Sequence, residues 1–197
     1  MPTFSKTFTP TAIEALDANG NSISITNPTR IIGSDADSTT YGQYVLASGS
    51  LAETFGWLSF DCSEIPDNAT INNVTCTVKI YSSGNANAIK IRQLRMYLEN
   101  RSTTKGFSVS MPTSTAAIAL DLGTIAWTAE QLYGAEVRLY SQRNTKNVSS
   151  NYYVRIYGAS LVVTWTVPVL HVNNNGTWEE VKNIYQKQNG IWVKKNS

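Results

Sequence analysis

Hydrophobic residues recur at every second position along most of this chain, and the helical period of 3.6 residues is almost absent. In the segment FGWLSFDC, Leu58, Phe60 and Cys62 fall on one face of an extended strand. The same alternation returns over residues 74–80, after a turn signal at residues 66–68 that contains Pro, Asp and Asn. Both segments therefore predict half-buried β-strands.

Similar alternation bounded by polar turns predicts more strands along the chain. These strands are expected at residues 23–26, 43–47, 89–98, 107–111, 118–122, 136–140 and 152–167. One helix signal interrupts them, because Thr128 and Gln131 have the spacing of a capping box and Gly134 provides a stop. The pattern predicts an all-β fold, an antiparallel β-sandwich or jelly roll with a short helix near residues 128–133.

A second, smaller unit is predicted after Pro168, which cannot donate to a strand ladder and should end the long strand before it. We expect a β-sandwich domain at 1–167 and a C-terminal two-hairpin module at 168–197. Each Asn-Gly pair in this module indicates a tight hairpin turn. The residues that repeat, and that we expect to form an assembly interface, are Asn175, Gly176, Trp178, Asn189, Gly190 and Trp192. The alternative is that the module only adds strands to the sandwich.

Composition narrows the possible partners. Charged residues make up 15% of the chain, against about 25% in ordinary globular proteins, and the net charge is +2. No basic run is present, so nucleic acid is not an expected partner. No apolar stretch is long enough for a membrane span, and the N-terminal sequence does not resemble a secretory signal, so we expect maturation in the cytoplasm. Cys62 and Cys76 are expected as reduced, buried thiols, although a disulfide between neighbouring strands stays open.

The residues that usually carry catalysis are sparse. His171 is the only histidine, and no nucleophile-elbow sequence accompanies it, so no catalytic residue and no cofactor is predicted. A pair of carboxylates for glycoside hydrolysis leaves no trace in a sequence and stays open. Asp35 and Asp37 are weak candidates for a metal site, since they lie two residues apart in a loop without the rest of a calcium motif.

Tyrosines give the clearest binding hypothesis. Tyr152, Tyr153 and Tyr157 lie close together, and Tyr41 and Tyr44 lie near a loop, so their rings could stack on sugar rings. Tyrosine also favours strands for packing reasons alone, and this structural reading is the alternative.

Three segments of the sequence resemble those of a known family: WLSFDCSEIPDNATINNVTCTVKIY, IAWTAEQLYGAEVRLYS and VRIYGASLVVTWTV. They resemble the jelly-roll modules of virion structural proteins of tailed bacteriophages, in particular tail, fibre and adhesion components. They resemble carbohydrate-binding jelly rolls of cell-wall proteins more distantly. The paired hairpins resemble small C-terminal extensions of phage structural proteins.

This resemblance implies a non-enzymatic component of a bacteriophage virion, assembled in the host cytoplasm, with other virion proteins as partners. We expect a homo-oligomer, and a trimer would suit a fibre. Trp178 and Trp192 would then anchor the C-terminal module to a partner. The alternatives are a module that recognises host cell-wall polysaccharide and a capsid decoration or head-fibre protein.

Overall fold

The structure is a computed structural model of the 197-residue chain. It describes residues 2–84, 88–98, 101, 103–122, 126–144, 151–168, 171–174, 177–180, 184–188 and 191–195. Side chains are described as far as residue 168, apart from those at 98, 103–107 and 121.

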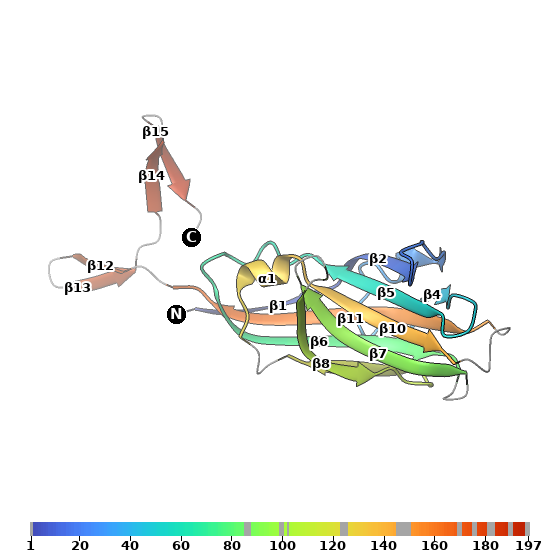
Figure 1. The fold of residues 1–197 in the computed structure, drawn as a ribbon. Helices are drawn as coiled ribbons and strands as arrows, with labels where there is room; N and C mark the ends of the chain where they lie inside the picture. The colour runs from blue at the N-terminus through green and yellow to red at the C-terminus, as the bar shows by residue number, and fades with distance from the viewer. Residues whose placement is uncertain are drawn as a thin grey trace.

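Two antiparallel sheets form the main body of the protein (Figure 1). Sheet A has the order β3-β4-β11-β6-β9, with β1 also paired to β11. Its strands are β1 (Thr3–Phe8), β3 (Ile25–Thr26), β4 (Gly42–Val45), β6 (Thr70–Ser82), β9 (Ala116–Asp121) and β11 (Tyr153–Thr166). Sheet B has the order β2-β5-β10-β7-β8. Its strands are β2 (Pro10–Asp17), β5 (Glu53–Phe60), β7 (Ile89–Leu98), β8 (Thr103–Ser110) and β10 (Glu136–Arg143).

The order of these strands is that of a jelly roll. Strands β4, β11, β6 and β9 are neighbours in sheet A, and β5, β10, β7 and β8 are neighbours in sheet B. Among these eight strands the chain therefore crosses between the sheets after β4, β5, β6, β8, β9 and β10, and the arrangement is that of two Greek keys. The predicted all-β antiparallel sandwich is confirmed.

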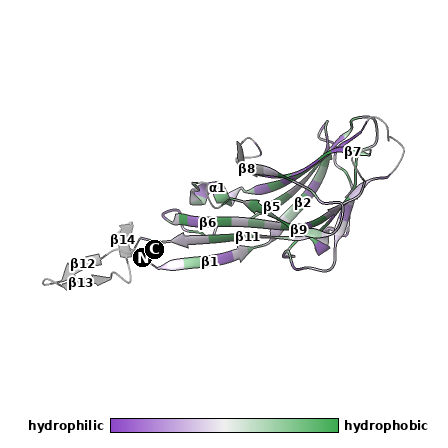
Figure 2. Ribbon diagram, turned by 90° about the horizontal axis from the view of Figure 1, so that it is seen from below, coloured by the Kyte–Doolittle hydropathy of each residue, from purple (hydrophilic) through white to green (hydrophobic). Residues whose placement is uncertain are grey.

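Apolar and polar side chains alternate along the long strands, so one face of each strand lies in the core. Val78 and Leu161 of sheet A, and Leu58, Leu94 and Leu139 of sheet B, are fully buried between the sheets. Burying each such side chain contributes about 1.5–3 kcal/mol. Figure 2 shows the resulting mixture of hydrophobic and hydrophilic positions along the strands. The two outer faces are left for polar and aromatic side chains.

Tyr44, one of the predicted sugar-stacking residues, lies in the core and not on the surface. It belongs to β4 and is only 1% exposed, because its ring points into the core toward β5. Gly56 of β5 provides the space: a Cβ atom there would lie 2.8 Å from Tyr44 Cζ and closer still to the hydroxyl. The prediction that Tyr44 stacks on a ligand is therefore wrong, and the residue joins the two sheets instead.

The short helix is α1 (Ala129–Tyr133), and its capping box forms as predicted. The Gln131 backbone amide donates to Thr128 Oγ1 at 3.3 Å, and the Thr128 amide donates to Gln131 Oε1 at 3.3 Å. A single 3₁₀ turn, η1 (Pro28–Arg30), precedes the loop that leads into β4. Strands β1 and β2 were not predicted. Strand β1 pairs with the C-terminal half of β11, from Thr3 opposite Thr166 to Phe8 opposite Leu161.

Strand β11 ends at Thr166, two residues before Pro168. Four short strands follow, β12 (His171–Asn174), β13 (Thr177–Glu180), β14 (Ile184–Gln188) and β15 (Ile191–Lys195). They pair as two hairpins, β12-β13 and β14-β15, that share no strand with either large sheet.

Within these hairpins, Trp178 lies opposite Asn173 and Trp192 opposite Lys187. The two Asn-Gly turns, at 175–176 and 189–190, lie outside the described residues.

Both cysteines are buried and are free thiols. Burial raises the pKa of Cys62 to about 12 and that of Cys76 to about 12. The disulfide that the sequence left open is thus absent between these two residues. No helix among the described residues has the length and apolar character to cross a membrane.

Candidate functional site

The outer face of sheet A carries a cluster of tyrosines around one arginine. We call it the tyrosine face, and it consists of Tyr41, Lys79, Tyr81, Tyr153, Arg155 and Tyr157, all half-buried. On β11, positions 153, 155 and 157 point outward because Val154 and Ile156 between them are fully buried. On β6, Tyr81 follows the fully buried Ile80 and so also points outward.

Arg155 lies at the centre of the tyrosine face. Its Cζ atom is 4.6 Å from the ring centroid of Tyr41, 4.8 Å from that of Tyr153 and 5.6 Å from that of Tyr81. The rings of Tyr41 and Tyr157 are 5.3 Å apart and tilted by 58°. Such cation–π and ring–ring contacts fix the rings side by side in one surface.

Strand register and hydrogen bonds hold this arrangement. Arg155 lies directly opposite Tyr81 of β6 on one side and Gln43 of β4 on the other. Its Nε atom donates to Gln43 Oε1 at 3.2 Å. Lys79 lies over the Tyr157 ring, 5.6 Å from Nζ to the centroid, and donates to the Ser38 carbonyl at 2.8 Å. The cluster is therefore preorganised by its own sheet and by the loop before β4.

That loop rests directly on β11, and a glycine makes the close approach possible. A Cβ atom at Gly158 would lie 2.5 Å from the Ser34 carbonyl oxygen. The Ala159 amide donates to the same oxygen at 3.0 Å, and the Ala36 amide donates to Ser160 Oγ at 3.1 Å. Because the loop is fixed on β11 in this way, Tyr41 at its end lies beside Tyr157.

Asp35 and Asp37, the weak metal candidates, lie in this loop. The Asp37 amide donates to Asp35 Oδ1 at 3.0 Å, so that carboxylate closes a local turn. Among the described residues, no group of three or more His, Cys, Asp or Glu side chains is arranged to hold a metal ion.

The structure brings together some of the predicted sugar-stacking residues. Tyr41 and Tyr153 both belong to the tyrosine face, whereas Tyr152 lies against Arg143, whose Cζ is 5.1 Å from its ring centroid. Tyr157, the other predicted ring, also belongs to the tyrosine face, but Tyr81 was missed as a site residue. The signal for Tyr81 was in the sequence, since it occupies the outward parity of a strand whose inward positions are apolar.

The outer face of sheet B carries a second group of rings and cations, which we call the arginine face. It consists of Phe55, Trp57, Arg95, Tyr97, Arg101, Arg138 and Tyr140. Arg138 Cζ lies 4.6 Å from the centroid of Tyr97, 5.2 Å from that of Tyr140 and 5.7 Å from that of Phe55. The rings of Trp57 and Tyr97 meet edge to face at 5.0 Å.

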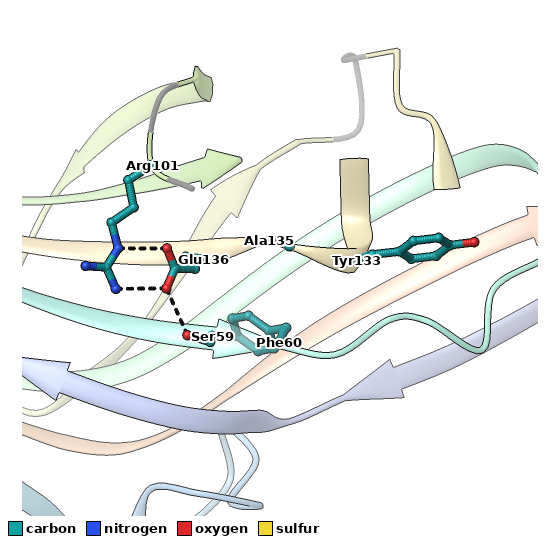
Figure 3. A pocket seen from close by; sticks show the side chains of 7 residues that line it. Ser59, Phe60, Arg101, Tyr133, Ala135 and Glu136 are labelled. Carbon is teal, nitrogen blue, oxygen red and sulfur yellow. Dashed lines mark hydrogen bonds and ion pairs between the residues drawn. The ribbon is translucent and has the colours of Figure 1, made fainter. Parts of the chain in front are cut away.

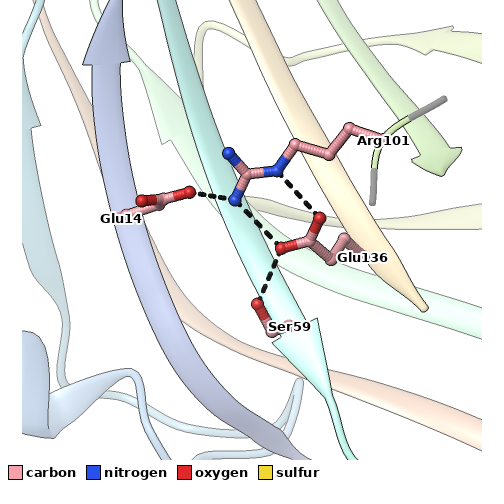
Figure 4. A network of polar contacts seen from close by, with 4 residues as sticks. All are labelled: Glu14, Ser59, Arg101 and Glu136. Carbon is pink, nitrogen blue, oxygen red and sulfur yellow. Dashed lines mark hydrogen bonds and ion pairs between the residues drawn. The ribbon is translucent and has the colours of Figure 1, made fainter. Parts of the chain in front are cut away.

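Arg101 covers one end of this face and is held by acidic side chains (Figure 4). Its Nε and Nη2 atoms donate to the two carboxylate oxygens of Glu136 at 2.8 and 3.0 Å, and Nη2 also contacts Glu14. Ser59 Oγ donates to Glu136 at 2.9 Å. The guanidinium lies 4.1 Å above the Trp57 ring centroid. One arginine thus joins β2, β5 and β10 from outside the sandwich.

A hollow of about 390 Å³ adjoins this network (Figure 3). It is lined by Ser59, Phe60, Arg101, Tyr133, Gly134, Ala135 and Glu136. Glycoside hydrolysis needs one carboxyl group that donates a proton and one that acts as base or nucleophile. Glu14 and Glu136 instead share one guanidinium, and the Tyr133 hydroxyl contacts the Ile65 carbonyl at 2.6 Å. The hollow therefore has the chemistry of a structural ion-pair network.

Neither a protein-family model nor a curated protein sequence matches this chain. Among solved structures, the family 11 carbohydrate-binding module of the cellulase Lic26A-Cel5E of Clostridium thermocellum is 12% identical, with a TM-score of 0.42, over 81% of this chain and 95% of the module. Xylanase10C of Cellvibrio japonicus is 12% identical, with a TM-score of 0.40, over 76% of this chain and 26% of the xylanase. A family two carbohydrate esterase from Cellvibrio japonicus is 12% identical, with a TM-score of 0.29, over 86% of this chain and 37% of the esterase. At this identity the likeness concerns the fold alone, so the chemistry of the site rests on its own residues.

Proposed function

We propose that this protein is a non-catalytic carbohydrate-binding module that holds a neutral glycan on the tyrosine face. The observation that carries the proposal is the gathering of four half-buried tyrosines around Arg155 on one outer sheet surface. Packing within a sheet accounts for pairs of neighbouring rings. Here they come from the loop before β4, from β6 and from β11, and they converge.

A sugar ring has an apolar C–H face and a rim of hydroxyl groups, and the tyrosine face matches both. The tyrosine rings offer large, rigid apolar surfaces. Among them, Arg155 and Lys79 carry several N–H donors, and the tyrosine hydroxyls both donate and accept. Because β11 and β6 fix these groups before any ligand arrives, little side-chain entropy is lost on binding.

The chemistry of the tyrosine face favours binding without turnover. Its six residues supply two cations and four phenols and no carboxylate. Hydrolysis of a glycosidic bond by the common route requires two acidic side chains. A ligand on this face would be held and released unchanged.

The test is a calorimetric titration of the full chain with neutral cell-wall oligosaccharides, beginning with cellohexaose and xylohexaose. We expect saturable binding that weakens about fivefold for Tyr153→Ala and for Tyr157→Ala, because each ring contributes about 1 kcal/mol of stacking. Tyr140→Ala, which removes a half-buried tyrosine from the opposite sheet, is the matched control and should bind like the wild type. Absence of saturable binding across the panel, or an equal loss in Tyr140→Ala, would remove the proposal.

Assembly into a virion is a second candidate, and one observation favours it. The hairpins β12-β13 and β14-β15 form sheets of their own beyond the last strand of the sandwich. Small two-stranded sheets are marginal alone in water, so a partner surface would stabilise them. We propose that the full chain forms a homo-oligomer and that a chain ending at Pro168 is a monomer by light scattering. A truncated chain with the mass of the full-length assembly would contradict this role.

A further inference from the structure

We propose that Arg95 and Arg138, on the outer face of sheet B, form a second binding site that takes the carboxylate of an acidic sugar such as a uronic acid. This site lies on the opposite sheet from the tyrosine face and does not depend on it.

Strand register places the two arginines together. Arg138 of β10 lies directly opposite Arg95 of β7, and both point outward because Leu139 and Leu94 beside them are fully buried. Like charges directly opposite each other on antiparallel strands destabilise a sheet. An anion between them would relieve this repulsion.

The guanidinium groups of both arginines lack hydrogen-bond partners among the described residues. Neither Arg95 nor Arg138 donates a hydrogen bond to a described residue, and the Nε atom of each is buried without a partner. No carboxylate among the described side chains forms an ion pair with either arginine, in contrast to Arg101. A guanidinium presents a planar fork of donors that matches a carboxylate, so the pair has both the charge and the geometry for one.

The acidic residues near the arginines are engaged elsewhere. Glu14 and Glu136 contact Arg101. Asp17, which lines the hollow beside Arg138, accepts hydrogen bonds from the Asn19 and Asn21 amides and from the Asn21 side chain. Glu53 accepts hydrogen bonds from the Tyr140 hydroxyl at 2.7 Å and from Gln142 Nε2 at 3.0 Å. These carboxylates balance the overall charge of the sheet, while Arg95 and Arg138 keep no direct counter-ion among the described residues.

A hollow beside Arg138 favours a sugar over a bare inorganic anion. It has a volume of about 310 Å³ and is lined by Leu16, Asp17, Ala18, Gly20, Phe55, Trp57, Tyr97, Arg101 and Arg138. Aromatic walls next to a cation fit a ring that carries a carboxylate. Burial among these rings, together with the nearby charge of Arg95, lowers the pKa of Arg138, and the charge of Glu53 offsets this shift only in part.

The experiment titrates the full chain with tri-galacturonate and, as the uncharged counterpart, with galactotriose. We expect saturable binding of tri-galacturonate that weakens with salt, and much weaker binding of galactotriose. Arg95→Gln and Arg138→Gln should each weaken tri-galacturonate binding roughly 10-fold or more, since each removes a charge-assisted contact. Arg30→Gln, which removes an exposed arginine of η1 that belongs to neither face, is the matched control and should leave tri-galacturonate binding unchanged.

Equal binding of the charged and uncharged trisaccharides would overturn the proposal, as would unchanged tri-galacturonate binding in both glutamine variants. Inorganic sulfate that competes as strongly as tri-galacturonate would show a general oxyanion site and overturn the assignment to a sugar. If Arg138→Gln did not fold, Arg95→Gln alone would decide. Failure here leaves neutral-glycan binding on the tyrosine face intact, because that binding is tested by Tyr153→Ala and Tyr157→Ala.

Discussion

Removing Arg101 should destabilise the sandwich substantially, because this one side chain joins three strands of sheet B. The Arg101 side chain is 29% exposed, that of Glu136 is 15% exposed and that of Glu14 is 45% exposed. The exposed contact to Glu14 is worth at most about 1 kcal/mol. The two-point contact to the more buried Glu136 is worth about 1.5–3 kcal/mol, and the stacking on Trp57 about 0.5–1 kcal/mol. We therefore expect Arg101→Ala to lower the free energy of unfolding by about 3 kcal/mol.

A double-mutant cycle separates the Glu136 contact from the rest. The free energies of unfolding of the wild type, Arg101→Ala, Glu136→Gln and the double variant would be measured by urea denaturation, followed by tryptophan fluorescence and far-UV circular dichroism. We expect a coupling energy of about 1–2 kcal/mol between the two residues. Lys6→Ala is the control, since it removes an exposed ion pair to Glu64 and a peripheral contact with the Phe8 ring and should cost less than about 1 kcal/mol. A coupling energy below about 0.5 kcal/mol would refute the bridging role of Arg101.

Two further predictions concern the core. Gly56→Ala should lower the free energy of unfolding by about 1–3 kcal/mol, because the added methyl group meets the Tyr44 ring. Tyr44→Phe should reduce that cost in the double variant, since the hydroxyl that it removes is the atom nearest to the added methyl group. Equal costs in both backgrounds, measured by urea denaturation, would contradict the contact. Cys62 and Cys76 should resist iodoacetamide at pH 8 in the native protein and react promptly in guanidinium chloride, because burial raises both pKa values to about 12. Native labelling at the unfolded rate, measured by mass spectrometry, would show that the thiols are accessible.

The strands that bury a full apolar face could be predicted from the sequence, because their alternation reports burial directly. Strands β6 and β11 follow this rule over most of their length. Strand β1 could not be predicted in the same way. Five of its six residues are exposed, and it is a strand because it pairs with β11, more than 150 residues away. Pairing at that distance leaves no local pattern.

The residues of the candidate site also differ in how far a local sequence pattern could place them. Tyr153 could be placed on an outer face because the apolar residues around it fix the parity of β11. Tyr44 could not, since the segment from Tyr41 to Leu46 has large side chains at both parities. The glycine that receives the Tyr44 ring lies on another strand of the opposite sheet. The pairing of Arg95 with Arg138 likewise depends on the register of two strands far apart in the chain.

The most direct test of the proposed function is to map where a neutral oligosaccharide binds. Backbone and tyrosine-ring NMR shifts would be followed while cellohexaose or xylohexaose is added to the isotope-labelled full chain. Binding on the tyrosine face predicts saturable shifts concentrated at Tyr41, Tyr81, Tyr153, Arg155 and Tyr157, with sheet B unchanged. Saturable shifts that gather on β5, β7 and β10, or spectra that no neutral oligosaccharide alters, would contradict it.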